Sequence, residues 1–321
     1  MTLQVLIHIG LHKTASSLLQ ERLFCRKDHG FERPTRDRRL IHDAFVLPGP
    51  LELTPGDALD DLRRARDAAT AAGRVLVISH ERLSGYPSSG GFDRRSIASR
   101  LRAAFPDARI LMVVREQRAM IASMYLQTVS DGSSLPIGRF LSPSEPRLLR
   151  MPGFRPDYLE YDSLLALYRE LFGERNVLLL PFEQLKSDPA TALARIYDHV
   201  HSERSHVAPF DPDLLRTHVN RSRPMAYQAL RRYFNVATRN QISDSGLFEF
   251  ETAKAEAIFR ALRPVAEVLR PLDSWLKKRL AAKVAHFCEG RYGASNARLE
   301  AATGLQLAPL GYDVTAPSVR P

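Results

Sequence analysis

The chain has few cysteines and no long hydrophobic run. Its two cysteines, Cys25 and Cys288, lie far apart in 321 residues, which excludes a disulfide framework and a cysteine-rich metal site. A reducing cytoplasm is the simplest compartment for such a protein. No apolar stretch approaches the ~20 residues that a membrane-spanning helix needs, and the first residues lack the basic start and cleavage site of a secretory signal. We therefore expect a cytoplasmic protein without a transmembrane segment.

Acidic residues are outnumbered by basic ones. The 46 lysines and arginines against 36 acidic residues give a formal charge of +10 at pH 7. Such an excess attracts anions, among them nucleic acids, acidic lipids, phosphorylated nucleotides and acidic glycans. Because the basic residues are scattered rather than gathered in one block with aromatic residues, no nucleic-acid partner is expected. His199, His201 and His206 lack a third donor at metal-ligand spacing, so no metal is expected either.

The first two thirds of the chain alternate strands with helices. Strands are predicted over residues 4–9, 75–79, 110–114 and 176–181, with helices over 16–26, 57–72, 94–105, 116–129, 162–172 and 188–199. This alternation predicts an α/β fold of three layers, α/β/α, around a central parallel sheet. Irregular segments are expected over 29–55, with a short helix at 41–45, and over 130–157, as a surface loop or lid.

The last third reads as helical, with helices expected over 225–235, 249–269 and 275–287. No linker rich in glycine or serine divides the chain. We expect one domain over residues 1–321, made of an α/β nucleotide-binding core (1–204) and a mainly helical C-terminal part (205–321). The C-terminal part is expected to pack on the sheet and to help wall the site.

The stretch after the first strand carries the groups that hold a phosphate. Gly10 allows a sharp turn and close approach to the backbone, Lys13 adds a positive charge, and three hydroxyls follow, on Thr14, Ser16 and Ser17. The alternative is an ordinary strand–helix connection in which Ser16 caps the helix. The stretch is not a Walker A loop, because it lacks a second glycine directly before the lysine.

Two further polar stretches follow buried strands. His80 and Glu81 come after the strand at 75–79, and Arg115 comes after the strand at 110–114. Ligands of parallel sheets bind outside the carboxyl ends of the strands. We therefore expect both stretches to meet the Gly10–Ser17 loop at one edge of the sheet.

The loop resembles that of the sulfotransferases that use 3′-phosphoadenosine 5′-phosphosulfate (PAPS), roughly H-x-G-x-x-K-T-G-[ST]-[ST]-x-L-Q. Ala15 departs from the family glycine, and His12 stands where proline is common. The resemblance implies a P-loop-NTPase-like sulfotransferase fold. It also implies that the 5′-phosphosulfate of PAPS is bound by a set of loop residues, Gly10, Lys13, Thr14, Ala15, Ser16 and Ser17.

A second stretch resembles the family signature R-x-P-x-x-x-x-x-S-x-Y, which holds the 3′-phosphate of the nucleotide. Arg115 and Ser123 match it, and Gln117 replaces the proline. Arginine offers two parallel donors to a phosphate, and a serine eight residues later lies close to a whole number of helical turns away. The alternative is a surface arginine with a helix serine that bonds its own backbone.

The group that accepts the sulfuryl must lose a proton to a base. The stretch His80-Glu81-Arg82-Leu83 resembles the S-E-x-L of glycan-directed and bacterial members of the family. Glu81 or His80 is therefore the expected base, with Lys13 stabilising the charge that develops on the leaving oxygen. The alternatives are a core histidine and a glutamate paired with Arg82.

Looser matches extend the resemblance over most of the chain. They are Val177 to Leu185 with Asp188-Pro189, the stretch Asn220-Arg221-Ser222, and the closing stretch Ser295 to Leu299 with Leu307, Gly311 and Tyr312. The resemblance implies that Asn220 and Ser222 touch the nucleotide. The alternative for them is a turn before a helix.

We therefore expect a PAPS-dependent, metal-independent sulfotransferase acting on a hydroxyl or amine of a glycan, glycolipid or small molecule. Two alternatives stay open: a P-loop small-molecule kinase, and a non-catalytic module that binds a nucleotide or polyanion. The sequence specifies neither the acceptor nor the oligomeric state.

Overall fold

The computed structural model describes residues 4–11, 13–14, 16–34, 38–49, 56–142, 153–200, 224–238, 257, 261, 264 and 268–315. Three residues of the expected site, Ala15, Asn220 and Ser222, lie outside the described residues, as do His12 of the loop and most of the helix expected over 249–269.

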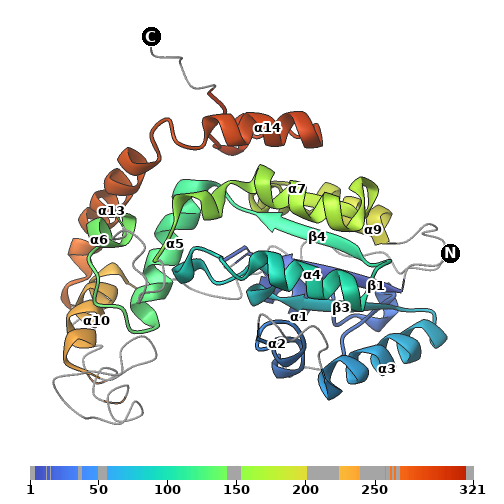
Figure 1. The fold of residues 1–321 in the computed structure, drawn as a ribbon. Helices are drawn as coiled ribbons and strands as arrows, with labels where there is room; N and C mark the ends of the chain where they lie inside the picture. Colours follow the sequence, from blue (N-terminus) through green and yellow to red (C-terminus); the bar gives the residue numbers. More distant parts are fainter. Residues whose placement is uncertain are drawn as a thin grey trace.

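A five-stranded sheet forms the centre of the molecule (Figure 1). Its order is β2 (Phe31–Glu32), β3 (Val75–His80), β1 (Val5–Gly10), β4 (Arg109–Val114) and β5 (Val177–Pro181). Every neighbouring pair is parallel, as expected. The edge strand β2 was not predicted, because two residues are too few to show a strand pattern.

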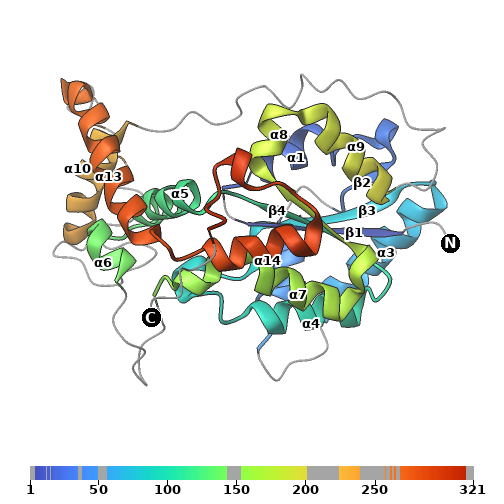
Figure 2. The ribbon, with the colours of Figure 1, turned by 90° about the horizontal axis from the view of Figure 1, so that it is seen from above.

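Helices cover both faces of the sheet, so the expected α/β/α layering is confirmed. Along β1, Val5 and Ile7 belong to one apolar core and Leu6 to another on the opposite face, as the alternation of side chains along a strand requires. Figure 2 shows α1 (Ser16–Arg22), α8 (Phe182–Ser187) and α9 (Pro189–Val200) on one side of the sheet. On the other side lie α4 (Arg94–Ala104) and α7 (Tyr161–Phe172).

Two segments expected to be irregular contain short helices. The segment 29–55 includes α2 (Arg39–Phe45), close to the expected 41–45, which packs against α3 (Asp57–Ala71). The segment 130–157 includes α6 (Ile137–Leu141). Conversely, the helix expected over 16–26 ends at Arg22, because the chain turns where the Phe24 N–H returns to the Leu19 carbonyl.

The described helices of the C-terminal part pack on helices of the α/β core. In it, α10 (Met225–Ala237) and α13 (Asp273–Cys288) pack against α5 (Gln117–Ser130), whereas α14 (Gly293–Thr303) packs against α7. Figure 1 shows α10 and α13 beside α5, away from the strands. Within the described residues, buried side chains of this part, such as Leu299 and Leu307, belong to the same apolar core as Ile110 of β4. That the whole C-terminal part packs on the sheet stays a prediction. The helix α14 was not predicted.

Candidate functional site

The expected polar stretches converge on one edge of the sheet. Ile9 pairs with His80, Gly10 with Val113, and Val114 with Pro181. Strands β1, β3, β4 and β5 therefore end at the same level, and the residues that follow them, including Glu81 and Arg115, share that edge. This convergence agrees with the expectation from the sequence, because the carboxyl ends of parallel strands lie at one edge of a sheet.

Side chains of the Gly10 loop pack closely against Gly10 and the turn that follows it. A Cβ at Gly10 would lie 2.2 Å from Ser16 Oγ, so only glycine leaves room for that hydroxyl. Ser16 Oγ is buried and has no hydrogen-bond partner among the described residues. Thr14 is buried, and its hydroxyl donates to the Leu11 carbonyl at 2.6 Å, so it stabilises the turn itself.

Lys13 has the left-handed backbone of the loop. Its φ of 66° makes it the only non-glycine residue with positive φ in the part of the chain that the structure describes. Gly10, by contrast, has no positive φ there. A left-handed conformation costs an L-residue about 1–2 kcal/mol, and such strain persists only where surrounding contacts impose it.

Arg115 supplies one of those contacts. Its Nη1 donates to the Lys13 carbonyl at 3.1 Å, and its guanidinium lies over the Phe182 ring, 5.1 Å from the centroid. Its Nε is buried and has no hydrogen-bond partner among the described residues. The arginine after β4 is thus joined to the loop after β1, as the sequence led us to expect. Ser123 lies within α5 and is partly buried.

His80 has the properties of a buried structural histidine. Only 6% of it is exposed, and its Nδ1 accepts the Arg82 N–H at 3.0 Å. Burial lowers the pKa of His80 to about 4, although nearby Glu81 opposes the shift. The imidazole is therefore neutral at pH 7, with one of its two nitrogens already in use.

Glu81 is more accessible and is paired with Arg38. Arg38 Nη1 lies 2.9 and 3.1 Å from the two carboxylate oxygens of Glu81. Arg82, the neighbour considered as its partner, instead pairs with Asp93 at 3.1 Å, because the turn after β3 carries the two side chains to different neighbours. The sequence did not indicate Arg38, which is one arginine among several in a segment without a periodic pattern.

A chain of polar contacts leads from Glu81 back into the sheet. Arg38 Nη2 donates to Gln20 Oε1 at 2.8 Å, and Gln20 Nε2 donates to Ser79 Oγ at 2.9 Å. Ser79 Oγ is 2.7 Å from His8 Nδ1. His8 is fully buried, and burial lowers its pKa to about 3. His8 and Gln20 match the first and last letters of the sulfotransferase loop pattern. Both therefore support the position of the Glu81 carboxylate.

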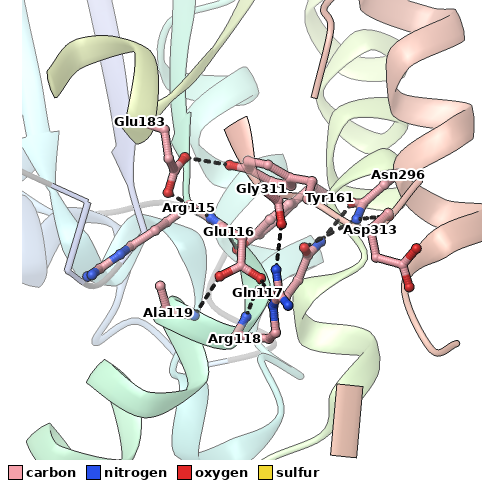
Figure 3. A network of polar contacts seen from close by, with 11 residues as sticks. Arg115, Glu116, Gln117, Arg118, Ala119, Tyr161, Glu183, Asn296, Gly311 and Asp313 are labelled. Carbon is pink, nitrogen blue, oxygen red and sulfur yellow. Dashed lines mark hydrogen bonds and ion pairs between the residues drawn. The ribbon is translucent and has the colours of Figure 1, made fainter. Parts of the chain in front are cut away.

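A second polar network surrounds the start of α5 (Figure 3). Glu116 caps the helix by accepting the N–H groups of Arg118 and Ala119, each at 2.9 Å. Gln117 and Asn296 form a reciprocal amide pair, with N···O distances of 2.7 and 3.2 Å. Gln117, which replaces the family proline, is therefore a buried link between α5 and the closing stretch.

A cavity lies next to the residues that follow Arg115. A cavity of 340 Å³ lies between the start of α5 and the end of α13, and Gln117 and Cys288 are among its lining residues. Neither Lys13 nor Glu81 lines it. Within the described ranges, no helix has the length and apolar character to cross a membrane. The same residues contain no cluster of three or more histidine, cysteine or acidic side chains suited to a metal ion.

Comparison with known proteins matches part of the chain to one family. Residues 96–205 match the model described as the sulfotransferase family, a segment that includes Arg115, Ser123 and Glu183. The family resemblance seen in the sequence is thereby confirmed. The Gly10 loop and Glu81 lie outside the matched segment. No curated protein matches the chain significantly.

Solved structures similar to this chain include two sulfotransferases. A sulfotransferase from Alicyclobacillus acidocaldarius is 21% identical with a TM-score of 0.47, covering 67% of this chain and 89% of that one. The sulfotransferase domain from the curacin biosynthetic pathway is 15% identical with a TM-score of 0.39, covering 67% and 77%. Because both TM-scores are low, the description of the fold rests on the sheet topology of this chain.

Proposed function

Because residues 96–205 match the sulfotransferase family, we propose that this protein transfers a sulfuryl group from PAPS. The acceptor is a hydroxyl or amine of a glycan, a glycolipid or a small molecule. One observation carries the proposal: the guanidinium of Arg115, inside the matched segment, is hydrogen-bonded to the carbonyl of Lys13, in the loop outside it. The contact joins the two stretches to which this proposal assigns phosphate binding, and a nucleotide phosphorylated at both ends would need two such groups close together.

In this proposal the Gly10 loop binds the 5′-phosphosulfate, through the backbone and side chains of residues 10–17. Arg115 and Ser123 bind the 3′-phosphate, and Asn220 and Ser222 complete the nucleotide site. Two observations support the fit: Ser16 Oγ and Arg115 Nε are buried polar atoms without a hydrogen-bond partner in the described part of the chain. Buried donors of this kind are costly unless a ligand or water pairs with them.

PAPS supplies an activated sulfuryl group whose transfer leaves 3′-phosphoadenosine 5′-phosphate. Glu81 accepts the proton of the acceptor hydroxyl as the new S–O bond forms. The ammonium of Lys13 stabilises the charge that grows on the bridging oxygen as the old S–O bond breaks. His80 is the weaker candidate for the base, because its Nδ1 is engaged and burial lowers its pKa.

We propose that the reaction needs no metal ion, since the sulfuryl group carries less charge than a phosphoryl group and positioning with electrostatics does most of the work. The cytoplasm remains the proposed compartment. A P-loop kinase would require ATP and Mg²⁺, and the loop lacks the second glycine of that motif. A non-catalytic binding module would bind the nucleotide but turn over no acceptor.

Calorimetry separates these proposals. We expect 3′-phosphoadenosine 5′-phosphate to bind without Mg²⁺ and more tightly than ATP. Arg115→Ala should lower the affinity for 3′-phosphoadenosine 5′-phosphate about 10- to 100-fold, the range for a lost charged hydrogen bond. It should hardly change the affinity for 5′-AMP. Tight ATP binding with no response to the bisphosphate would refute the sulfotransferase proposal. A screen of acceptors with labelled PAPS then distinguishes an enzyme from a binding module.

A further inference from the structure

The peptide unit between Arg115 and Glu116 is held by side chains on both of its polar sides (Figure 3). The Tyr161 hydroxyl, at the start of α7, donates to the Arg115 carbonyl at 2.7 Å. The N–H of Glu116, on the other side of the same peptide, donates to Glu183 Oε1, in α8, at 3.1 Å. Two elements distant in sequence thus hold one peptide plane at the end of β4.

Tyr312 completes this arrangement from the closing stretch. Its hydroxyl donates to the second carboxylate oxygen of Glu183 at 3.0 Å. Both tyrosines are buried, with Tyr161 at 0% and Tyr312 at 4% exposure. Burial is the main cause that raises the pKa of each well above its usual value, so both hydroxyls keep the protons that they donate. We call Tyr161, Glu183 and Tyr312 the Arg115 clamp.

Fixing this peptide fixes the direction in which the Arg115 side chain leaves the strand. The plane defines ψ of Arg115 and φ of Glu116, the two soft dihedrals on either side of it. Phe182, next to Glu183, lies under the guanidinium, and the Lys13 carbonyl accepts from its Nη1. The stretch after β5 therefore contacts Arg115 on two sides, with Glu183 at its backbone and Phe182 at its side chain.

We propose that Tyr161, Glu183 and Tyr312 are positioning residues that hold Arg115 ready to bind the phosphate of a nucleotide. The inference rests on the proposed function, because it takes Arg115 as a ligand of the 3′-phosphate. It gives a role to the Glu183 stretch and to the closing Gly311-Tyr312, two parts of the sequence pattern that the proposed chemistry does not use. It also connects Tyr312, in the closing stretch, to the nucleotide site through Glu183 and Arg115.

Tyr161→Phe and Tyr312→Phe test the clamp, since each removes one hydroxyl and keeps the ring. The probes are adenosine 3′,5′-bisphosphate and 5′-AMP, measured by calorimetry beside the thermal midpoint of each variant. We expect each variant to bind the bisphosphate about 3- to 10-fold more weakly, as for one lost hydrogen bond, and to bind 5′-AMP nearly as wild type does. Glu183→Gln, which keeps an acceptor for the Glu116 N–H, should lose less than Glu183→Ala.

Tyr168→Phe is the matched control. Tyr168 is also in α7, is 1% exposed, and donates to the Leu83 carbonyl at 3.4 Å, away from Arg115. Loss of the Tyr168 hydroxyl should leave the ratio of the affinities for adenosine 3′,5′-bisphosphate and 5′-AMP unchanged.

The outcomes separate this inference from the proposed function. If Arg115→Ala weakens the bisphosphate selectively while both tyrosine variants bind both nucleotides like wild type, the clamp is refuted and the proposed function stands. Equal losses for the two nucleotides in the tyrosine variants would mean a structural role only and would also refute the clamp. If Arg115→Ala shows no selectivity, the assigned role of Arg115 and the clamp both fail. Should a tyrosine variant not fold, the comparison of Glu183→Gln with Glu183→Ala decides.

Discussion

At the scale of single residues, Lys13 combines an exposed side chain with a strained backbone. Its φ of 66° is unusual for a residue with a Cβ, and the hydrogen bond from Arg115 to its carbonyl holds it there. In the proposed function the side chain of Lys13 binds the ligand, whereas its backbone conformation belongs to the loop, so the two contributions are separable by substitution.

Lys13→Ala should lower turnover with PAPS by about 10²- to 10³-fold, the range for losing one stabiliser of transition-state charge. The thermal midpoint should change little, because the side chain is exposed. Lys13→Gly is the matched control: it loses the same charge but accepts positive φ without strain, so it should be equally inactive and slightly more stable. Undiminished activity of either variant would contradict the loop assignment.

Glu81 and His80 are adjacent but differ in their surroundings, so their variants should differ. Glu81→Gln keeps an oxygen for Arg38 and removes the proposed base, so we expect kcat to fall about 10²- to 10⁴-fold with the fold intact. His80→Ala should mainly lower the free energy of unfolding, since the imidazole is buried. An inactive but fully stable His80→Ala beside an active Glu81→Gln would reverse the assignment of the base.

At the scale of elements, the amide pair of Gln117 and Asn296 joins α5 to α14. Both side chains are buried, and Asn296 Nδ2 also donates to the Asp313 carbonyl at 2.7 Å. The start of α5, which follows Arg115, is therefore tied to a helix that begins 176 residues after it in the sequence.

Asn296→Leu should lower the free energy of unfolding by about 1–3 kcal/mol, because it leaves the Gln117 amide buried with fewer partners. Urea denaturation at constant pH measures this change. The double variant Gln117→Leu/Asn296→Leu should cost less than the sum of the two single variants, since it removes both members of the pair. Strict additivity would mean that the two amides do not interact energetically.

At the scale of the whole molecule, three buried or partly buried histidines have lowered pKa values. Burial lowers the pKa of His8 to about 3, and those of His80 and His199 to about 4, against about 6.5 in an unfolded chain. The unfolded state therefore binds more protons than the folded state when the pH falls below about 6.5, and acidification destabilises the fold.

The free energy of unfolding should fall by about 1 kcal/mol per histidine between pH 7 and pH 5.5. Urea denaturation at a series of pH values measures this slope. His199, whose Nε2 donates to the Ile110 carbonyl at 3.1 Å, lies outside the candidate site and provides the test variant. His199→Gln should remove about one histidine's share of the slope. A slope that is unchanged in His199→Gln would show that His199 is not neutral in the folded protein.

The sequence predicted the strands and most helices closely. The sequence after each strand placed Gly10, Glu81 and Arg115 at what proved to be one edge of the sheet. Short elements were missed, because β2 has two residues and α6 has five, too few to show a period. The helix α14 was not predicted, because its buried face is mostly small or polar, with Gly293, Ser295, Asn296 and Leu299, and so shows no apolar helical period.

The sequence by itself determined the layered parallel fold and the polar residues at the carboxyl ends of its strands. Local residue patterns are enough to predict buried strands and the turns that lead from strand to helix. Only the tertiary structure decided which groups meet there. It paired Glu81 with Arg38 rather than Arg82, joined Arg115 to the Lys13 carbonyl, and brought Tyr312 to Glu183. These contacts link segments far apart in the chain, and no local pattern encodes them, because they follow from how the sheet orders its strands and how the last helices pack.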